Sequence, residues 1–145
     1  MADTEPTKRG SARTKARKRA LDILFEADLR ELAATEVLAA HLDENDPPVR
    51  EFSVTIVEGV TADLDRIDEL ISTNLASGWT LGRIPRVDRN LARIAVYELI
   101  HTDTSSDVVL AEAVSLCQDL STDESPAFLN GLLASVVAAQ AVARG

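Results

Sequence analysis

The chain has 145 residues, of which 46% are hydrophobic and only 3% aromatic, so its core must be built mainly from Leu, Val, Ile and Ala. The formal net charge is -9, and the single cysteine, Cys117, excludes an internal disulfide and a cysteine-based zinc site. A single cysteine fits a reducing cytoplasm. The sequence has no unbroken run of about 18 apolar residues, so it predicts no membrane span. The basic N-terminus lacks the apolar block of a secretion signal. We therefore expect a soluble cytoplasmic protein without membrane contact.

The positive charge of this acidic chain is concentrated near its N-terminus. Residues 8–19 contain seven Lys and Arg residues and no Asp or Glu. Such a split between segments suggests a polyanionic partner at the basic end, and the acidic remainder would confine contact to that end. We expect residues 1–11 to form a flexible basic tail and residues 12–145 a single folded domain. The seven cations are Lys8, Arg9, Arg13, Lys15, Arg17, Lys18 and Arg19.

The first half of the chain shows helical periodicity and no alternation long enough for a strand. We predict helices over residues 12–30 and 35–45. A third helix is predicted to start at "DPP", with Asp46 as its cap and Pro47 in its first position. A fourth helix, marked by apolar residues between 64 and 75, is predicted to end at "SGW".

The second half of the chain predicts three longer helices. The first, over residues 84–102, is apolar nearly all round at "IAVY" and should be central and buried. The second, over residues 105–120, starts at a serine cap, and the third, over residues 125–143, starts at Ser125 as its cap. Gly131 inside the last helix predicts a close helix–helix approach, since glycine otherwise weakens a helix. Together these elements predict an all-α fold of seven helices.

The basic start of the first predicted helix is unusual for a folded protein. On a helical wheel, Arg13 and Arg17 fall on the same stripe as Ala20 and Leu24, and burying an unpaired guanidinium is costly. The helix start must therefore project past the core or meet an anion. Cations at a helix N-terminus are disfavoured by about 0.3–1 kcal/mol each, but free backbone N–H groups there suit a phosphate. We interpret the segment as a nucleic-acid-binding surface, the alternative being a solvated tail that aids solubility.

Single-stranded RNA is a better candidate ligand than duplex DNA. The sequence has no helix-turn-helix signature, zinc finger or basic-zipper heptads. Single-stranded RNA is usually bound through phosphate contacts and through bases stacked on aromatic side chains. Phe25 and Phe128 are the candidates for stacking, and for each the alternative is a core phenylalanine.

Motifs for catalysis are absent from the sequence. His41 and His101 share no metal-ligand spacing with carboxylates or Cys117, which we expect to be an inert core thiol. No phosphate-binding loop, nucleophile elbow or paired-carboxylate motif is found. Trp79, after a predicted helix end, is expected to anchor packing. We expect no enzyme, no catalytic residue, no metal and no cofactor.

Four stretches resemble, in order and spacing, the NusB family of bacterial transcription antitermination factors: "ARTKARKRALDILFEADL", "RVDRNLARIAVYEL", "VVLAEAVSLCQDL" and "SPAFLNGLL". The resemblance covers residues 12–137. It implies an all-helical fold of two packed bundles that binds boxA-type single-stranded leader RNA of ribosomal RNA operons. It also implies a heterodimer with NusE, a small-subunit ribosomal protein, within an RNA polymerase antitermination complex.

The resemblance also implies roles for individual residues. The basic segment from Lys8 to Arg19 would be the RNA surface, together with Phe25 and Phe128. The family often has tyrosine at the position of Phe25, which keeps the stacking face but lacks the hydroxyl. Asp88 and Glu124 would lie near the RNA and partner surfaces. Ala111 stands where the family often has asparagine, so a polar role there is in doubt.

Two other functions are compatible with parts of the sequence. A similar domain precedes the catalytic part of some ribosomal RNA cytosine methyltransferases, but we expect a chain ending at Gly145 to leave no room for a cofactor-binding domain. The other is a purely structural protein–protein adaptor, as a homodimer, in ribosomal RNA maturation or ribosome assembly. In that case the basic segment would be incidental.

Overall fold

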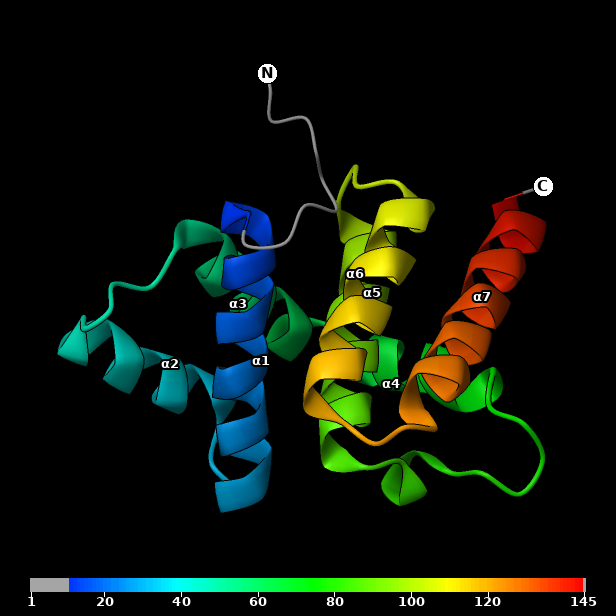
Figure 1. Cartoon of the computed structure of the whole chain (residues 1–145), viewed down its shortest axis with the longest axis horizontal. Helices are drawn as coiled ribbons and strands as arrows, with labels where there is room; N and C mark the ends of the chain where they lie inside the picture. The colour runs from blue at the N-terminus through cyan, green and yellow to red at the C-terminus, as the bar shows by residue number, and fades with distance from the viewer. Residues whose placement is uncertain (1–10, 145) are drawn as a thin grey trace.

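The computed structural model describes residues 11–144, which form seven α-helices and one 3-10 helix and contain no strand (Figure 1). The predicted basic tail, apart from Ser11, lies outside the described residues. The elements are α1 (Ala12–Arg30), α2 (Ala34–Glu44), α3 (Glu51–Ala62), α4 (Leu64–Thr73), η1 (Leu81–Arg83), α5 (Arg86–His101), α6 (Ser106–Leu120) and α7 (Ser125–Arg144).

The helices form two bundles that share α5. In Figure 1, α1, α2 and α3 pack together on one side, and α4, α6 and α7 lie on the other, with α5 in contact with helices of both groups. Ile94, Ala95, Val96 and Tyr97 of α5 are all buried, in agreement with the apolar "IAVY" region. The predicted all-α fold of two packed bundles with a central fifth helix is therefore confirmed.

The start of α3 differs from the prediction. Residues 46–50 are not helical, and α3 begins at Glu51 after Arg50, which has extended backbone angles. The second proline of "DPP" gives the physical reason, because a residue before a proline is disfavoured in the α conformation. Pro48 therefore keeps Pro47 out of a helix, and Asp46 caps nothing.

The start of α7 also differs in its chemistry from the prediction. Ser125 is the first residue of α7, and its hydroxyl donates to the carboxylate of Asp88 at 2.6 Å instead of capping the helix. The predicted serine cap of α6 is confirmed, because the Ser105 hydroxyl accepts from the backbone N–H of Val108. Ser105 therefore caps a helix, whereas Ser125 binds a buried carboxylate.

One stretch of α7, Ser125–Ala143, is long and apolar enough to cross a membrane by length and composition alone, with a mean hydropathy of 1.5. The sequence-based expectation of no such segment relied on unbroken apolar runs, and polar residues interrupt this one. Leu129, Leu133 and Val136 are fully buried in the hydrophobic core, and α7 packs against α5 and α6. α7 is therefore a packed helix of the second bundle, with 22% of its apolar stretch buried.

Two helical glycines have opposite surroundings. A Cβ at Gly59 of α3 would overlap the ring of Tyr97 on α5, so this is where two helices approach closely. A Cβ at Gly131 of α7 would meet nothing within 4 Å, and Gly131 is exposed. The prediction of a close approach at Gly131 is therefore wrong.

These surroundings predict opposite effects of alanine on stability. Gly59→Ala should lower the free energy of unfolding by about 1–3 kcal/mol, because the Tyr97 ring must move. Gly131→Ala should raise it by up to about 1 kcal/mol, because alanine is the better helix former and nothing is displaced. Urea unfolding of both variants measures the effect, and destabilisation by Gly131→Ala would contradict this account.

Candidate nucleic-acid interface

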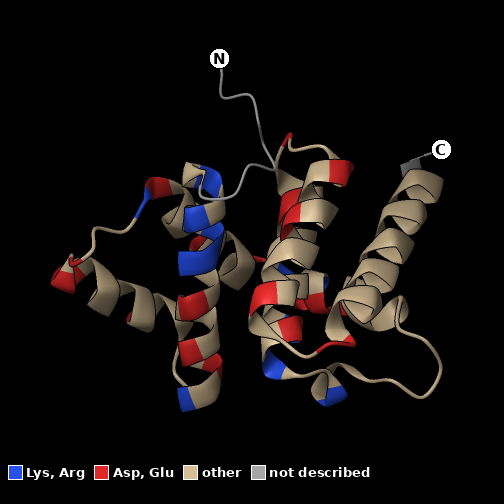
Figure 2. Ribbon diagram, viewed as in Figure 1, with Lys and Arg blue, Asp and Glu red and all other residues tan. Residues whose placement is uncertain are grey.

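The charge on α1 changes sign along the helix. Its N-terminal half carries the basic residues from Arg13 to Arg19, and its C-terminal half carries acidic residues from Asp22 onward (Figure 2). The helix is capped by the Ser11 side chain, which accepts from the Thr14 N–H at 3.1 Å, and no acidic residue lies in the first turn. Within the helix itself, only the weak surface pair of Lys18 with Asp22 therefore offsets an N-terminal cation.

The anions that meet Arg17 come from two distant helices. Arg17 is only 3% exposed, and its guanidinium forms two hydrogen bonds with Glu98 of α5, at 2.7 and 2.8 Å, and one with Glu112 of α6, at 2.8 Å. The Thr14 hydroxyl donates to the same Glu112 carboxylate at 2.8 Å. Burial alone lowers the pKa of Arg17, but the hydrogen bonds and charges of Glu98 and Glu112 outweigh it and raise this pKa. The predicted need of this helix start for an anion is therefore met at Arg17 within the protein, by Glu98 and Glu112.

The sequence contains a signal for this network. Glu98 and Glu112 are single carboxylates within otherwise apolar blocks, "YEL" and "AEA". A charge on a predicted inward face requires a partner of opposite charge. Arg17, on the inward stripe of α1, was the cation that could supply it.

The other cations of α1 differ in their solvent exposure and in whether they form ion pairs. Arg13 and Lys15 are exposed, and neither makes an ion pair within the described residues 11–144; the Arg13 guanidinium lies 3.9 Å from the centroid of the Phe52 ring. Lys18 is exposed and only 3.8 Å from Asp22, a surface pair of little strength. Arg19 is half-buried. Arg13, Lys15 and Lys18 are named the basic face below; Lys8 and Arg9 lie outside the described residues.

Arg19 joins α1 to α2 and to the connection that follows it. Its Nε donates to Nδ1 of His41 at 3.2 Å, and its Nη2 donates to the carbonyl of Pro47 at 3.1 Å. Because Nδ1 of His41 accepts, the other ring nitrogen is the one that donates to Glu26, 3.1 Å away. The hydrogen bond from His41, followed by that from Arg30, lowers the pKa of Glu26. Arg19 therefore has a structural role, which is to hold α1 against α2 and the connection after it.

A cavity of about 520 Å³ borders the basic face at Arg13. Phe52 and Tyr97 supply aromatic walls, and Thr104 supplies a hydroxyl. Asp103 also lines it, so the cavity is mixed in charge. It places aromatic and polar groups next to an exposed guanidinium.

The two candidate stacking residues lie in different surroundings. Phe25 is half-buried on α1, one to two helical turns beyond Lys18. Phe128 is half-buried near the start of α7, packs against the core, and has its ring centroid 5.1 Å from that of Trp79. The starts of α1 and α7 lie at opposite ends of the molecule (Figure 1). The structure therefore does not bring Phe128 to the basic face.

Asp88 is an internal acceptor in this structure. It is 1% exposed and accepts from the hydroxyls of Ser121 and Ser125, each at 2.6 Å, and from the thiol of Cys117 at 3.9 Å. It therefore holds the start of α5 to the end of α6 and the start of α7. Burial, followed by the charge of Asp88, raises the pKa of Cys117 to about 11, as expected for an inert core thiol. Glu124 is exposed in the connection before α7.

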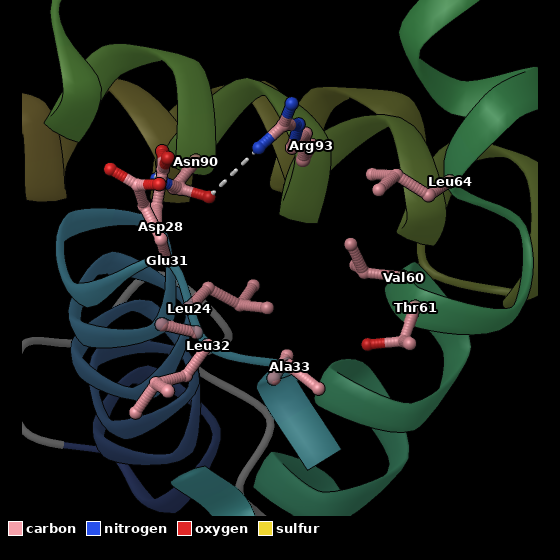
Figure 3. Close-up of a pocket in the computed structure, with 12 residues that line it drawn as sticks. Leu24, Asp28, Glu31, Leu32, Ala33, Val60, Thr61, Leu64, Asn90 and Arg93 are labelled. Carbon is pink, nitrogen blue, oxygen red and sulfur yellow. Dashed lines mark hydrogen bonds between the residues drawn. The ribbon is translucent and has the colours of Figure 1, made fainter. Parts of the chain in front are cut away.

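A second cavity, of about 430 Å³, lies between α1, α3 and α5 (Figure 3). Leu24, Val60 and Leu64 point into it, and Asn90 and Arg93 lie at its polar edge (Figure 3). These polar groups already have partners, since Arg93 forms two hydrogen bonds with Asp68 and the Asn90 amide donates to Asp28. Within residues 11–144, no group of three or more His, Cys, Asp or Glu residues could hold a metal ion.

Comparison with known proteins agrees with the resemblance found in the sequence. Residues 14–138 match the NusB family. The chain belongs to the NusB family. It is 57% identical over 129 residues to the transcription antitermination protein NusB of Salinispora tropica, covering 86% of this chain and 94% of that protein. It is 58% identical over 131 residues to the protein of the same name from Acidothermus cellulolyticus, covering 90% of both.

A solved structure of antitermination factors NusB and NusE in complex with dsRNA has a similar fold. The TM-score is 0.77 at 25% sequence identity, and the likeness covers 88% of this chain and 96% of that one. The fold expected from the NusB family is therefore the fold observed.

The Arg17 network predicts a large and specific loss of stability. Arg17→Ala should lower the free energy of unfolding by about 3–5 kcal/mol, because two buried carboxylates lose their cation. Lys18→Ala, the matched loss of an exposed cation one residue away, should change it by less than about 0.5 kcal/mol. Thermal and urea unfolding of both variants measures this, and equal stabilities would contradict the assigned role of Arg17.

Proposed function

We propose that this protein is an RNA-binding transcription antitermination factor. It would recognise boxA-type single-stranded leader RNA of ribosomal RNA operons together with NusE, within an RNA polymerase antitermination complex, in the cytoplasm and without catalysis of its own. The observation that carries the proposal is membership of the NusB family, whose curated relatives are named transcription antitermination proteins. The related complex of NusB and NusE with dsRNA supports the RNA and the protein partner.

The basic face of α1 is the proposed phosphate-binding surface. Arg13, Lys15 and Lys18 are exposed on a helix whose position is fixed by the buried Arg17 network. Because the chain as a whole carries a charge of -9, phosphates are attracted here and repelled elsewhere. Lys8 and Arg9, which precede this face in the sequence, would add further phosphate contacts.

Phe25 is the proposed stacking residue beside the basic face. It follows Lys18 by two helical turns, so both lie on one side of α1, as does the exposed Leu29. A base stacked on Phe25 would therefore continue a strand whose phosphates contact the start of the helix. Glu124 is the proposed modulating residue, since its exposed carboxylate near Phe128 would repel phosphates and so lower the affinity for RNA.

Arg17 and Asp88 take part in the proposal only through other residues. Both are buried and hydrogen-bonded within the protein, so neither is free for a phosphate or a partner. Arg17 would set the orientation of the basic face, and Asp88 would set the position of Glu124 and Phe128. Arg19 would contribute with the part of its guanidinium not used by His41 and Pro47.

The proposal predicts a salt-dependent affinity for RNA. If four or five phosphates are neutralised, log K against log[salt] should have a slope of about −3 for a boxA-type single strand. Arg13→Ala combined with Lys15→Ala should flatten that slope by about 1.4, because two phosphate contacts are lost. Fluorescence anisotropy of a labelled RNA, alone and with NusE present, measures both values.

Arg66→Ala is the control for that measurement, since Arg66 is an exposed cation on α4. It should leave the slope unchanged. The affinity for an RNA duplex of the same sequence is measured as well, and comparison of the two affinities shows whether the protein prefers single-stranded or duplex RNA. Equal slopes for the wild type and the Arg13–Lys15 double variant would remove RNA binding from the basic face.

Stacking on Phe25 predicts a loss of affinity without a loss of stability. Phe25→Leu should weaken RNA binding by about 1–3 kcal/mol, the usual contribution of one stacked base. The melting temperature should change little, because leucine retains most of the apolar surface of the half-buried ring. A large fall in melting temperature at unchanged affinity would instead assign Phe25 to the core.

A further inference from the structure

We propose that Trp79, held by Arg83 and Phe128, is a second base-stacking site for single-stranded RNA, at the end of the molecule away from the basic face. This inference rests on the proposed RNA-binding function and adds to it a site in the connection between α4 and α5. The three side chains are named the Trp79 cluster below.

In the Trp79 cluster, the exposed ring of Trp79 packs on the ring of Phe128. Trp79 is 42% exposed, and its ring centroid lies 5.1 Å from that of Phe128, with the ring planes inclined by 43°. Phe128 in turn packs against the hydrophobic core. Trp79 therefore packs on Phe128, as expected of a packing anchor, while a large part of the indole surface meets solvent.

The backbone before Trp79 holds the ring in place. Gly78 has a φ of +92°, a left-handed conformation that side chains rarely adopt, and the Trp79 N–H donates to the carbonyl of Ala76 at 3.0 Å. Nη1 of Arg83 donates to the carbonyl of Gly78 at 2.7 Å, and its guanidinium lies 5.6 Å from the Trp79 ring centroid. The cation and the ring are thus preorganised together.

The connection that carries Trp79 suits a phosphate backbone, whereas the exposed Asp123 and Glu124, in the connection before α7, oppose one on the Phe128 side. Residues 74–87 contain two arginines and no Asp or Glu, in a chain that is otherwise rich in acids. Figure 2 shows the connection from α4 to α5 with blue segments and no red one, and the acid in the first turn of α5, Asp88, is buried. Arg86 is shared with Asp28, 3.6 Å away, whereas Arg83 makes no ion pair within the described residues. Arg83 is therefore the cation available to a phosphate next to a stacked base.

The surroundings of Trp79 favour a base over a protein partner. The neighbours of Trp79 in the chain, Ser77, Gly78, Thr80 and Gly82, are all exposed and small, so this segment adds little apolar surface beside the indole. Protein hot spots are usually enclosed by a ring of further contacts. A flat ring with an adjacent guanidinium is the arrangement that binds unpaired bases.

The Trp79 cluster also changes the role of Phe128. The sequence and the family resemblance predict that Phe128 itself stacks on RNA. In the structure its ring is half-buried and packed against Trp79, so the more exposed aromatic surface at this end of the molecule belongs to Trp79. Phe128 is then the support of the stacking residue.

Intrinsic fluorescence gives a direct test, because Trp79 is the only tryptophan of the chain. Titration with a boxA-type single-stranded RNA, with and without NusE, should quench Trp79 emission as a base stacks on it. An RNA of the same length with abasic nucleotides keeps every phosphate and should bind without quenching. Trp79→Leu should bind the intact RNA about 5- to 150-fold more weakly, the range expected for one stacked base.

The control variants separate stacking from folding. Trp79→Phe keeps an aromatic face and should restore most of the affinity, whereas Leu42→Ala removes an apolar side chain of similar exposure and should have no effect. Arg83→Ala should weaken binding and Arg66→Ala should not. Circular-dichroism melting of each variant identifies any loss that comes from unfolding.

The outcomes distinguish this inference from the proposed function. RNA bound at wild-type affinity by Trp79→Leu, with unchanged wild-type fluorescence, would overturn the Trp79 site and leave the proposed function intact. A fluorescence change caused by NusE alone, and not by RNA, would make Trp79 a protein contact and also overturn the inference. Absence of RNA binding by the wild type, alone and with NusE, would overturn both.

Discussion

The orientation of the basic face depends on one buried interaction, the contact of Arg17 with Glu98 and Glu112. It connects α1 to α5 and α6, two helices that follow it by more than fifty residues. In the interior, one guanidinium pairs with two carboxylates. Such a network needs good geometry to offset the loss of hydration. Its three hydrogen bonds of 2.7–2.8 Å and the added hydroxyl of Thr14 supply that geometry. Because Arg17 is fixed inward, Lys15 and Lys18 lie on the exposed side of α1.

The same network resolves a conflict at the start of α1. Cations near a helix N-terminus oppose the helix dipole, and this helix has no acid in its first turn. The carboxylate of Glu112 lies against both Thr14 and Arg17, so a negative charge from α6 takes the place that a capping acid would have. The helix start is therefore stable without an external anion. Arg13 and Lys15, which are exposed and make no ion pair within residues 11–144, are available to bind one.

The two ends of the molecule use different means to present a binding surface. At the start of α1, exposed cations stand on a helix held by a buried ion network. At the start of α7, hydroxyls and a thiol converge on the buried carboxylate of Asp88, and this joint fixes the connection that leads to Phe128 and its partner Trp79. In both places a buried polar residue acts as the support, and the exposed residues near it carry the proposed contacts. This explains how buried residues such as Arg17 and Asp88 can be coupled to binding without touching a ligand.

The sequence by itself determined the helical fold, the central position of α5, the split of charge along the chain and the family, because these follow from local periodicity, composition and motif spacing. It also predicted correctly that Cys117 is a buried thiol. It could not assign the cations of α1 individually, since the partners of Arg17 are supplied by α5 and α6. It placed Gly131 at a close approach that belongs to Gly59, because a helical glycine looks the same in sequence whether or not another helix faces it. Only the tertiary structure decided which arginine is internal, which aromatic ring is exposed at the start of α7, and that Asp88 is a buried acceptor: each of these depends on side chains far apart in sequence meeting at one point.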